Sequence, residues 1–391
     1  MRNAFTGLVF AAATLAVIAT GAPPKSALAD LRPVPDTVDA PLASSPSALT
    51  SPAVPDPSLL RPGEERWFAN PRQLTRGGQN AEAYFSFSGK RICFQSTRDG
   101  YPCDQIYIMN PDGTNVQRIS NGTGRTTCSF IYPGDRDILF ASTHLVSPDC
   151  PPPPPADSSL GYVWSLYDYD IFRMHIGSSL YHRITTHPGY DAEGCLTPDG
   201  ETLVYTSLAN GDLDIYSLTA DGDAKRLTDD YGFDGGPFVS WDGKLIVYRG
   251  YHPHGEKAVS EYRQLIGRRL MKPVQAEIYL MNLDGSGKRQ LTSNGAANWA
   301  PAFHPNGRQI IFSSNLAAPG TPKFDLYVMN LDGSDIQRVT QGGFNSFPYF
   351  SPDGKTLLFC SDRNAKQPHE FNVFAVDWTG SAVDSTAPGA K

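Results

Sequence analysis

Short apolar runs separated by Asp-Gly turns dominate the pattern of hydrophobic and polar positions along this chain. The clearest example reads FDLYVMNLDGSDIQRVTQGGFNSFPYFSPDGKTLLFCSDRN and spans residues 324–364. The pattern predicts four short strands there, at 327–330, 337–340, 347–350 and 356–360. Because glycine accepts a positive φ, each Asp-Gly pair reverses the chain and joins antiparallel strands. The last run is almost wholly apolar, which indicates a strand that is covered on both faces.

The same unit recurs along the chain. The residue that closes the short polar strand returns at spacings of 45, 65, 43, 64 and 48 residues, as Thr75, Ser120, Thr185, Thr228, Thr292 and Thr340. The turn before the apolar strand occurs six times, at Ser88-Gly89, Gly134-Asp135, Asp199-Gly200, Asp242-Gly243, Asn306-Gly307 and Asp353-Gly354. A period of about 45 residues with four short strands per unit is typical of a β-propeller. The sequence therefore predicts an all-β fold, a six-bladed β-propeller.

The repeat also resembles that of a known family, the TolB-like propellers with their WD40-like (PD40) repeat. The residues that carry the resemblance are 350–355 (FSPDGK), 358–359 (LF) and 325–333 (DLYVMNLDG). The resemblance covers about residues 70–380 and implies six blades. It further implies that 72–75 is the outer strand of the last blade and pairs with the C-terminal strand near 373–376. Such pairing closes the ring and removes exposed sheet edges.

The start of the chain is predicted to be a signal peptide, residues 1–29. Arg2 supplies a positive charge, the apolar core at 8–18 is too short to span a bilayer, and Ala27-Leu28-Ala29 fits a cleavage site. We therefore expect an exported protein, periplasmic or secreted, with no transmembrane segment after removal of the signal.

Composition divides the rest of the chain. Residues 30–62 hold eight prolines and no aromatic residue, which predicts a disordered Pro-rich linker where TolB has a folded α/β domain. The propeller is expected at 63–380 and a disordered tail at 381–391. The net charge of −7 argues against a nucleic-acid partner, because such binders need a basic surface. We expect a monomer.

Two units are longer than the others by about twenty residues, at 145–167 and 251–275. Both insertions follow the apolar second strand, so both are expected on the same rim of the ring. Apolar residues at helical spacing predict a helix over 256–271. Insertions on one face of a repeat array commonly build its binding surface, and the alternative is that they only pack on the rim.

Six cysteines are present. Cys93, Cys195 and Cys360 lie in or beside apolar strands and are interpreted as small buried hydrophobic residues. Cys103 and Cys150 lie in equivalent loops of adjacent units, which makes a disulfide between them plausible in an exported protein. Cys128, at the start of an inner strand, is the competing partner.

A polar position recurs seven residues before each turn, where the first strand of each blade faces the channel. These residues are Asn80, Thr126, Asp191, Asp234, Asn298 and Asn345, with Glu82 and Glu193 two residues beyond the first and third. One interpretation is that they cap turns through their own backbone. The other is that Glu82, Asp191, Glu193 and Asp234 bind a cation or the basic group of a ligand at the channel mouth.

A second set of polar residues follows the second strand: Arg98, His144, His252 and Arg363, with Arg249 and His254 nearby. On the same rim as the insertions, these residues could clamp an anion or a carboxylate. The alternative is that they form salt bridges with the acidic residues above. His252 and His254 are also a candidate pair of metal ligands, but without a third ligand the metal is unknown.

The chain carries no HExxH motif, no Gly-x-Ser-x-Gly elbow and no phosphate loop, and we expect no hydrolase domain after the last blade. The function predicted is a non-catalytic scaffold that binds a protein or peptide partner in the cell envelope, at the channel mouth and the rim. One alternative, from propellers that resemble this one, is a metal-dependent lyase or hydrolase on acidic sugars, whose candidate ligands are His144, His252 and His254. Another is carbohydrate binding through Trp164, Tyr162 and Tyr251. No cofactor is expected, apart from a possible divalent cation in the channel.

Overall fold

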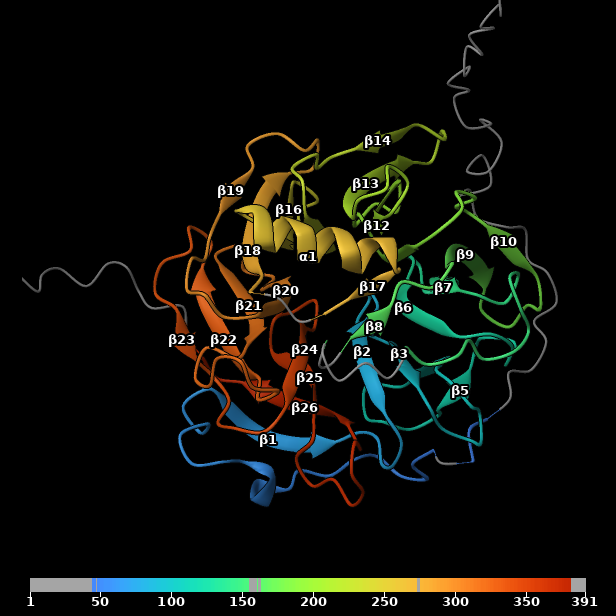
Figure 1. Cartoon of the computed structure of the whole chain (residues 1–391). Helices are drawn as coiled ribbons and strands as arrows, with labels where there is room; N and C mark the ends of the chain where they lie inside the picture. The colour runs from blue at the N-terminus through green and yellow to red at the C-terminus, as the bar shows by residue number, and fades with distance from the viewer. Residues whose placement is uncertain (1–43, 47, 155–159, 161–162, 273–274, 381–391) are drawn as a thin grey trace, which may run out of the picture.

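Six four-stranded antiparallel sheets stand around a common axis in the computed structural model, which describes residues 44–46, 48–154, 160, 163–272 and 275–380. Figure 1 views the ring nearly along that axis, with the blades arranged around the centre of the picture. The predicted six-bladed β-propeller is confirmed.

The strands of the first three blades run from the axis outward in chain order. Blade 1 contains β2 (Asn80–Phe85), β3 (Ile92–Ser96), β4 (Gln105–Met109) and β5 (Gln117–Arg118). Blade 2 contains β6 (Thr126–Ile131), β7 (Asp137–Ser142), β9 (Asp170–His175) and β10 (Tyr181–Arg183). Blade 3 contains β11 (Asp191–Leu196), β12 (Thr202–Ser207), β13 (Asp214–Thr219) and β14 (Ala224–Arg226).

The last three blades repeat this order, and the sixth borrows its outer strand from the start of the chain. Blade 4 contains β15 (Phe233–Val239), β16 (Leu245–Tyr251), β18 (Glu277–Asn282) and β19 (Arg289–Gln290). Blade 5 contains β20 (Asn298–Phe303), β21 (Gln309–Ser314), β22 (Asp325–Asn330) and β23 (Gln337–Arg338). Blade 6 contains β24 (Asn345–Phe350), β25 (Thr356–Ser361), β26 (Asn372–Trp378) and β1 (Phe68–Gln73).

The pairing of β1 with β26 closes the ring, as the family resemblance implied. Gln73 lies opposite Phe374, and the amide of Leu74 donates to the carbonyl of Val373 at 2.8 Å. This pairing covers the edge of β26 and makes β1 the outer strand of blade 6.

The recurring Thr or Ser has one structural role in all six blades. Its hydroxyl accepts a hydrogen bond from an amide of the third strand, as Thr340 does from Leu326 at 2.8 Å and Ser120 does from Ile106 at 3.0 Å. The other four pairs are Thr185–Ile171, Thr228–Ile215, Thr292–Ile278 and Thr75–Val373. The hydroxyl thus satisfies a strand amide where the short outer strand has ended.

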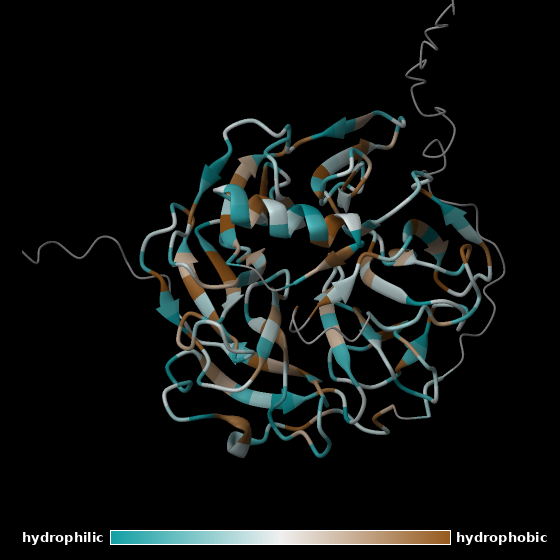
Figure 2. Ribbon diagram, viewed as in Figure 1, coloured by the Kyte–Doolittle hydropathy of each residue, from teal (hydrophilic) through white to brown (hydrophobic). Residues whose placement is uncertain are grey.

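Apolar side chains fill the space within and between blades, which Figure 2 shows as brown segments inside the ring and teal segments on the outer strands and loops. The second strands are the most buried, with Phe94, Phe140, Phe312 and Phe359 fully covered. Each of these rings lies beside an aromatic ring of the third strand, 5.7 to 6.4 Å away between centroids. Burial on both faces explains why these strands do not alternate between apolar and polar residues.

The prediction of a disordered linker at 30–62 is wrong for the part of it that the structure describes. The amide of Ser45 donates to Val116, and that of Ala53 donates to Asp112, so this segment follows the outside of blade 1. A short 3-10 helix, η1 (Pro57–Leu59), follows and buries Leu59. The segment needs no core of its own because it packs on the finished blades; residues 30–43 lie outside the described residues.

The two insertions form one cap over the ring. β8 (Trp164–Ser165) in the first insertion pairs with β17 (Leu270–Met271) in the second, and α1 (Glu256–Gly267) lies across the ring in Figure 1. Both insertions therefore rise from the same rim, as predicted. The helix ends earlier than 271, because Arg269 has a positive φ of 53° and Leu270 begins the strand that pairs with Ser165.

No helix in the described part of the chain has both the length and the apolar character needed to cross a membrane.

Candidate functional site

A cavity of about 410 Å³ lies at the centre of the ring, beneath the cap. Blades 1 to 6 all contribute to its wall, and Pro153, Pro154, Val163, Trp164 and Tyr167 of the first insertion contribute to its roof. Glu82, Trp164 and Trp299 keep part of their surface exposed, so solvent reaches the cavity.

One residue from each inner strand forms a ring around the cavity, and all six have a left-handed backbone. These residues are Glu82, Cys128, Glu193, Gly236, Ala300 and Phe347, with φ between 45° and 57°. The register of each inner strand shifts at this point, so each residue sits in a β-bulge. A bulge re-aims a side chain, which here turns the bulge residue of five of the six inner strands to the axis; in β15 that residue is Gly236. We call this set the bulge ring.

An aromatic cluster closes the channel at the level below the bulge ring. Tyr84, Phe130, Phe238 and Tyr349 come from four different inner strands, and their ring centroids lie 5.1 to 6.4 Å apart. Edge-to-face contacts of this kind pack the axis with side chains. The cavity is therefore blind at this end, and a ligand has to enter from the rim that carries the cap.

Glu193, on one side of the bulge ring, is held by three donors. Arg249 forms an ion pair with it, and the amide of Gly236 and the hydroxyl of Thr206 each donate to Oε2 at 2.8 Å. Arg249 is buried, and its guanidinium lies 4.9 Å from the ring of Trp299. The charge of Glu193 is thus compensated within the protein.

Glu82 also lines the cavity, but it forms no ion pair within the described part of the chain. Burial raises the pKa of Glu82 to about 7; contact with the Cys128 thiol opposes this shift, and Glu193 reinforces it. Burial likewise raises the pKa of the Cys128 thiol well above its usual value, so that thiol stays protonated. Among the described residues, Glu82 is the carboxyl group of the cavity wall that has no ion-pair partner, although the charge of Arg249 acts on it from a distance.

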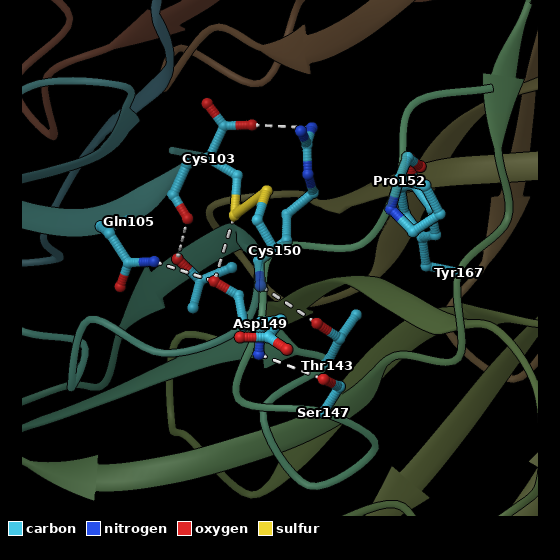
Figure 3. Close-up of a disulfide and its surroundings, with 12 residues drawn as sticks. Cys103, Gln105, Thr143, Ser147, Asp149, Cys150, Pro152 and Tyr167 are labelled. Atoms are coloured by element: carbon cyan, nitrogen blue, oxygen red, sulfur yellow. Dashed lines mark hydrogen bonds and ion pairs between the residues drawn. A yellow bond between two sulfur atoms is a disulfide. The ribbon is translucent and has the colours of Figure 1, made fainter. Parts of the chain in front are cut away.

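Asp104 and Arg125 form a second ion pair on the wall, 3.1 Å apart. The residue before Asp104 is Cys103, which is joined to Cys150 in a disulfide with Cα atoms 5.9 Å apart. Figure 3 shows this bond beside Gln105 and Thr143, with Tyr167 near Pro152. The hydroxyl of Tyr167 donates to the carbonyl of Pro152 at 2.6 Å. The disulfide therefore ties the base of the first insertion to the wall of the cavity, while Cys128 is free.

The polar residues at the start of each inner strand hold the blades together and do not line the cavity. The Oδ1 atoms of Asn80, Asp191, Asn298 and Asn345 accept from the Ser hydroxyls that end their neighbouring strands, at 2.5 to 2.9 Å. The side-chain amide of Asn80 also donates to the carbonyl of Phe371 in blade 6, at 2.7 Å. The predicted bonds to the local backbone are also present, because the side-chain amides of Asn80 and Asn345 donate to the carbonyls of Gly77 and Gly342 at 2.9 Å. The same side chains add bonds within and between blades. Burial raises the pKa of Asp191 to about 6.

Arg98 and Arg363 lie inside the blades and not in the cavity. Arg98 donates to Asn80 at 2.6 Å and lies over the ring of Phe94, and Arg363 donates to Asn345 at 3.0 Å. Arg363 also pairs with Glu64, which is fully buried, at 3.0 Å. These contacts use the guanidinium groups structurally, so the structure does not bring them together as an anion clamp.

The predicted histidines lie apart from the cavity, and His144 lies in a different blade from His252 and His254. His144, in blade 2, contacts the hydroxyl of Ser142 at 2.7 Å. His252 and His254 line a separate hollow on blade 4, where His252 contacts the buried Asp234 at 3.1 Å. Burial lowers the pKa of His252, but the bond with Asp234 outweighs it, so the pKa lies above its usual value. The three ligands that the lyase alternative required therefore do not converge.

Trp164 is the predicted aromatic residue that does reach the cavity, where its ring lies 5.1 Å from that of Trp299. Tyr251 does not line the cavity, and Tyr162 lies outside the described residues. Sequence reasoning missed Trp299, Tyr190 and the Asp104–Arg125 pair. Trp299 follows Asn298 and Tyr190 precedes Asp191, so a search of the neighbours of the polar residues that begin the inner strands would have found both.

Metal ligands are not clustered in the part of the chain that the structure describes: no three His, Cys, Asp or Glu side chains there come together as a site for an ion. Of the four carboxylates predicted to share a cation, Glu82 and Glu193 meet at the cavity. Asp191 and Asp234 lie outside it, bonded to Ser207 and His252.

Comparisons with known proteins agree with this architecture. A family model, the TolB β-propeller domain (PD40), matches residues 264–384. A Bacillus subtilis protein called the uncharacterized peptidase YuxL is 31% identical over 156 residues, which are 34% of this chain and 23% of that protein. This chain covers less than half of the length of the curated relatives that it matches.

Solved structures show the fold. A protein assigned to TolB from Agrobacterium tumefaciens is 20% identical and superimposes with a TM-score of 0.51, over 78% of this chain and 92% of that chain. TolB from Acinetobacter baumannii is 18% identical, with a TM-score of 0.52 over 70% of this chain and 57% of that chain. The chain is therefore a six-bladed β-propeller, and its residues 264–384 match the TolB β-propeller domain.

Proposed function

We propose that this protein is a non-catalytic scaffold that takes a segment of a protein or peptide partner into the central cavity. One observation carries the proposal: the cavity is closed at one end by the aromatic cluster and roofed at the other by described residues of the first insertion. Concave sites with apolar walls and a few placed polar groups are typical binding sites, and about 410 Å³ lies at the small end of their size range. The cavity suits one or two residues of an extended segment.

The chemistry of the wall favours binding over turnover. Glu193 is already saturated by Arg249, Gly236 and Thr206, and the protonated Cys128 thiol is a poor nucleophile. A hydrolase or lyase would need a base and an activated partner within reach of one another. The fold alone does not decide the question, because propellers carry many unrelated functions.

We place the proposed activity in the cell envelope. The predicted signal at 1–29 lies outside the described residues, but the Cys103–Cys150 disulfide suits an oxidising compartment. The likeness to TolB supports the same location by analogy of fold.

Photocrosslinking from within the cavity tests the proposal. The photoreactive residue p-benzoylphenylalanine replaces Trp164 in the cap in one variant. In a control it replaces Leu180, which is 66% exposed in the turn between β9 and β10, at the end of blade 2 opposite the cap. Irradiation of intact cells should give a discrete protein adduct from position 164 and not from position 180. Equal labelling at both positions would overturn the peptide assignment. So would an oligosaccharide mixture that, added before irradiation, prevents the adduct at position 164 from forming.

A turnover assay completes the test, because the non-catalytic part of the proposal needs its own measurement. Purified full-length chain is incubated with peptide and acidic-oligosaccharide libraries with and without added Mn²⁺, and the products are followed by mass spectrometry. Unchanged libraries are expected. Cleavage that disappears in the His252→Ala variant would support the lyase alternative instead.

A further inference from the structure

Among the described residues, the cavity wall holds one more acidic side chain than basic ones. Its wall carries three carboxyl groups, Glu82, Asp104 and Glu193, and two guanidinium groups, Arg125 and Arg249. Arg249 pairs with Glu193, and Arg125 pairs with Asp104. Glu82 remains without an ion-pair partner among the described residues. An ionised carboxyl group in such a site is unfavourable, so it is neutralised either by a proton or by a ligand that supplies the opposite charge.

The walls around this carboxyl group are aromatic. Trp164, Trp299, Tyr167, Tyr169 and Tyr190 all line the cavity. The protein already places its own cations on these faces, because Arg249 lies 4.9 Å from the ring of Trp299 and Arg125 lies 5.7 Å from that of Tyr167. Aromatic faces attract ammonium and guanidinium groups, most strongly where water is excluded.

We infer that the cavity binds a cationic group of the partner, a lysine ammonium or an arginine guanidinium, with Glu82 as its counter-ion and Trp164 and Tyr190 among its aromatic walls. This inference rests on the proposed function and names the chemistry of the segment that enters. The aromatic cluster below makes the cavity a dead end, so it suits the end of a long side chain better than a chain that passes through. An acidic group would instead face the uncompensated carboxyl group of Glu82.

Binding of a cation at Glu82 is coupled to pH. Burial raises the pKa of Glu82 to about 7 in the empty protein, so this carboxyl group is roughly half protonated at neutral pH. The charged and titratable groups that face it are Glu193, Arg249, Asp104, Cys128 and Tyr84. A cation requires the ionised form, so its affinity should rise by up to about tenfold between pH 6 and pH 8.

Four blocked peptides test the inference. The probes are acetyl-Ala-Ala-X-Ala-Ala-amide with X as lysine, arginine, norleucine or glutamate, titrated into the full chain by calorimetry at pH 8. The lysine and arginine peptides should bind at least about tenfold more tightly than the norleucine peptide, as expected for one compensated charge. The glutamate peptide should bind most weakly.

Two variants make the test specific to Glu82. Glu82→Gln should reduce binding of the lysine peptide by about tenfold or more and remove its pH dependence. Glu201→Gln, at an exposed turn beside β12, is the matched control and should change neither. Circular dichroism confirms that each variant is folded.

The outcomes separate this inference from the proposed function. If all four peptides bind equally and binding is lost in Trp164→Ala, the cavity binds peptides but the cationic inference is wrong. If Glu82→Gln binds the lysine peptide as tightly as the unmodified chain does, the assignment of Glu82 is wrong. No binding of any probe at millimolar concentration would count against both.

Discussion

Arg249 reaches Glu193 across the wall of the cavity through a space that only glycine leaves open at position 236. A Cβ atom there would lie 2.3 Å from Nη1 of Arg249, which is closer than any real contact. Gly236 belongs to the bulge ring, with a φ of 57°. The other five bulge-ring residues have side chains. Because Gly236 has none, the guanidinium of Arg249 fits beside the backbone of blade 4.

Replacing Gly236 by alanine should therefore displace Arg249 and leave Glu193 without its cation. Breaking such a buried pair destabilises a protein, and we expect a loss of about 2 to 4 kcal/mol in the free energy of unfolding. Urea denaturation measures it. The matched control is Gly295→Ala, because Gly295 has a φ of 68° and open space around its Cβ position. The control should lose about 1 kcal/mol, from backbone strain alone. Equal losses in the two variants would show that the clash is unimportant.

The repeat pattern was enough to predict the six blades. Asp-Gly turns and apolar second strands are local signals, and the Thr or Ser at the end of each unit bonds the neighbouring third strand, so its spacing follows the blades directly. The pairing of 72–75 with 373–376 was implied by the family resemblance, and the register of β1 on β26 agrees with it.

The site was harder to predict because tertiary packing creates it. Five of the six bulge-ring residues are not glycine, although all have a positive φ, so no local signal marks them. The polar residues that lie two positions before the bulge-ring residues carry the stronger sequence signal, but they serve contacts within and between blades. The linker between 44 and 62 was misjudged for a related reason: it has no core of its own and packs on surfaces that other segments provide.

Glu82 should weaken the fold at alkaline pH. Its pKa is about 7 in the native state against an ordinary value of 4.5, so the native state binds more protons than the unfolded state between these values. Stability from this group is present below about pH 4.5 and is lost as the pH rises to 7. Glu82→Gln should therefore be more stable than the unmodified chain at pH 8, by about 1 to 3 kcal/mol, and equal to it at pH 4.

Urea denaturation at pH 4, 6 and 8 measures this difference, with Glu201→Gln as the exposed control whose effect should not vary with pH. A Glu82→Gln protein that is less stable at pH 8 would mean that Glu82 has a structural partner, which would also argue against its role as a counter-ion for a ligand.

The cap should open locally when its small apolar cluster is weakened. Leu265 of α1 packs with Val163 and Leu270 from the two insertions, separately from the main core. Leu265→Ala should speed trypsin cleavage within 251–275, which contains five Lys or Arg residues, by several-fold. Global unfolding should shift little, because the blades do not depend on this cluster. Val54→Ala, at a 74% exposed position, is the control. Unchanged cleavage in Leu265→Ala would mean that the cap is held mainly by other contacts, such as that of Tyr262 with Asp212.

The oxidation state of the cysteines gives the most direct test of how the cap is anchored. Cys103 and Cys150 are bonded, and Cys93, Cys128, Cys195 and Cys360 are free and buried. Iodoacetamide should therefore add little to the native chain, four groups after denaturation without reductant, and six after reduction, as counted by intact mass.

The Cys103→Ser/Cys150→Ser double variant should lose about 2 to 4 kcal/mol of unfolding free energy. It should also bind the lysine peptide more weakly, because Asp104 follows Cys103 in the cavity wall. Six additions without reductant would show that the cap has no covalent anchor, and its order would then have to come from β8, β17 and α1 alone.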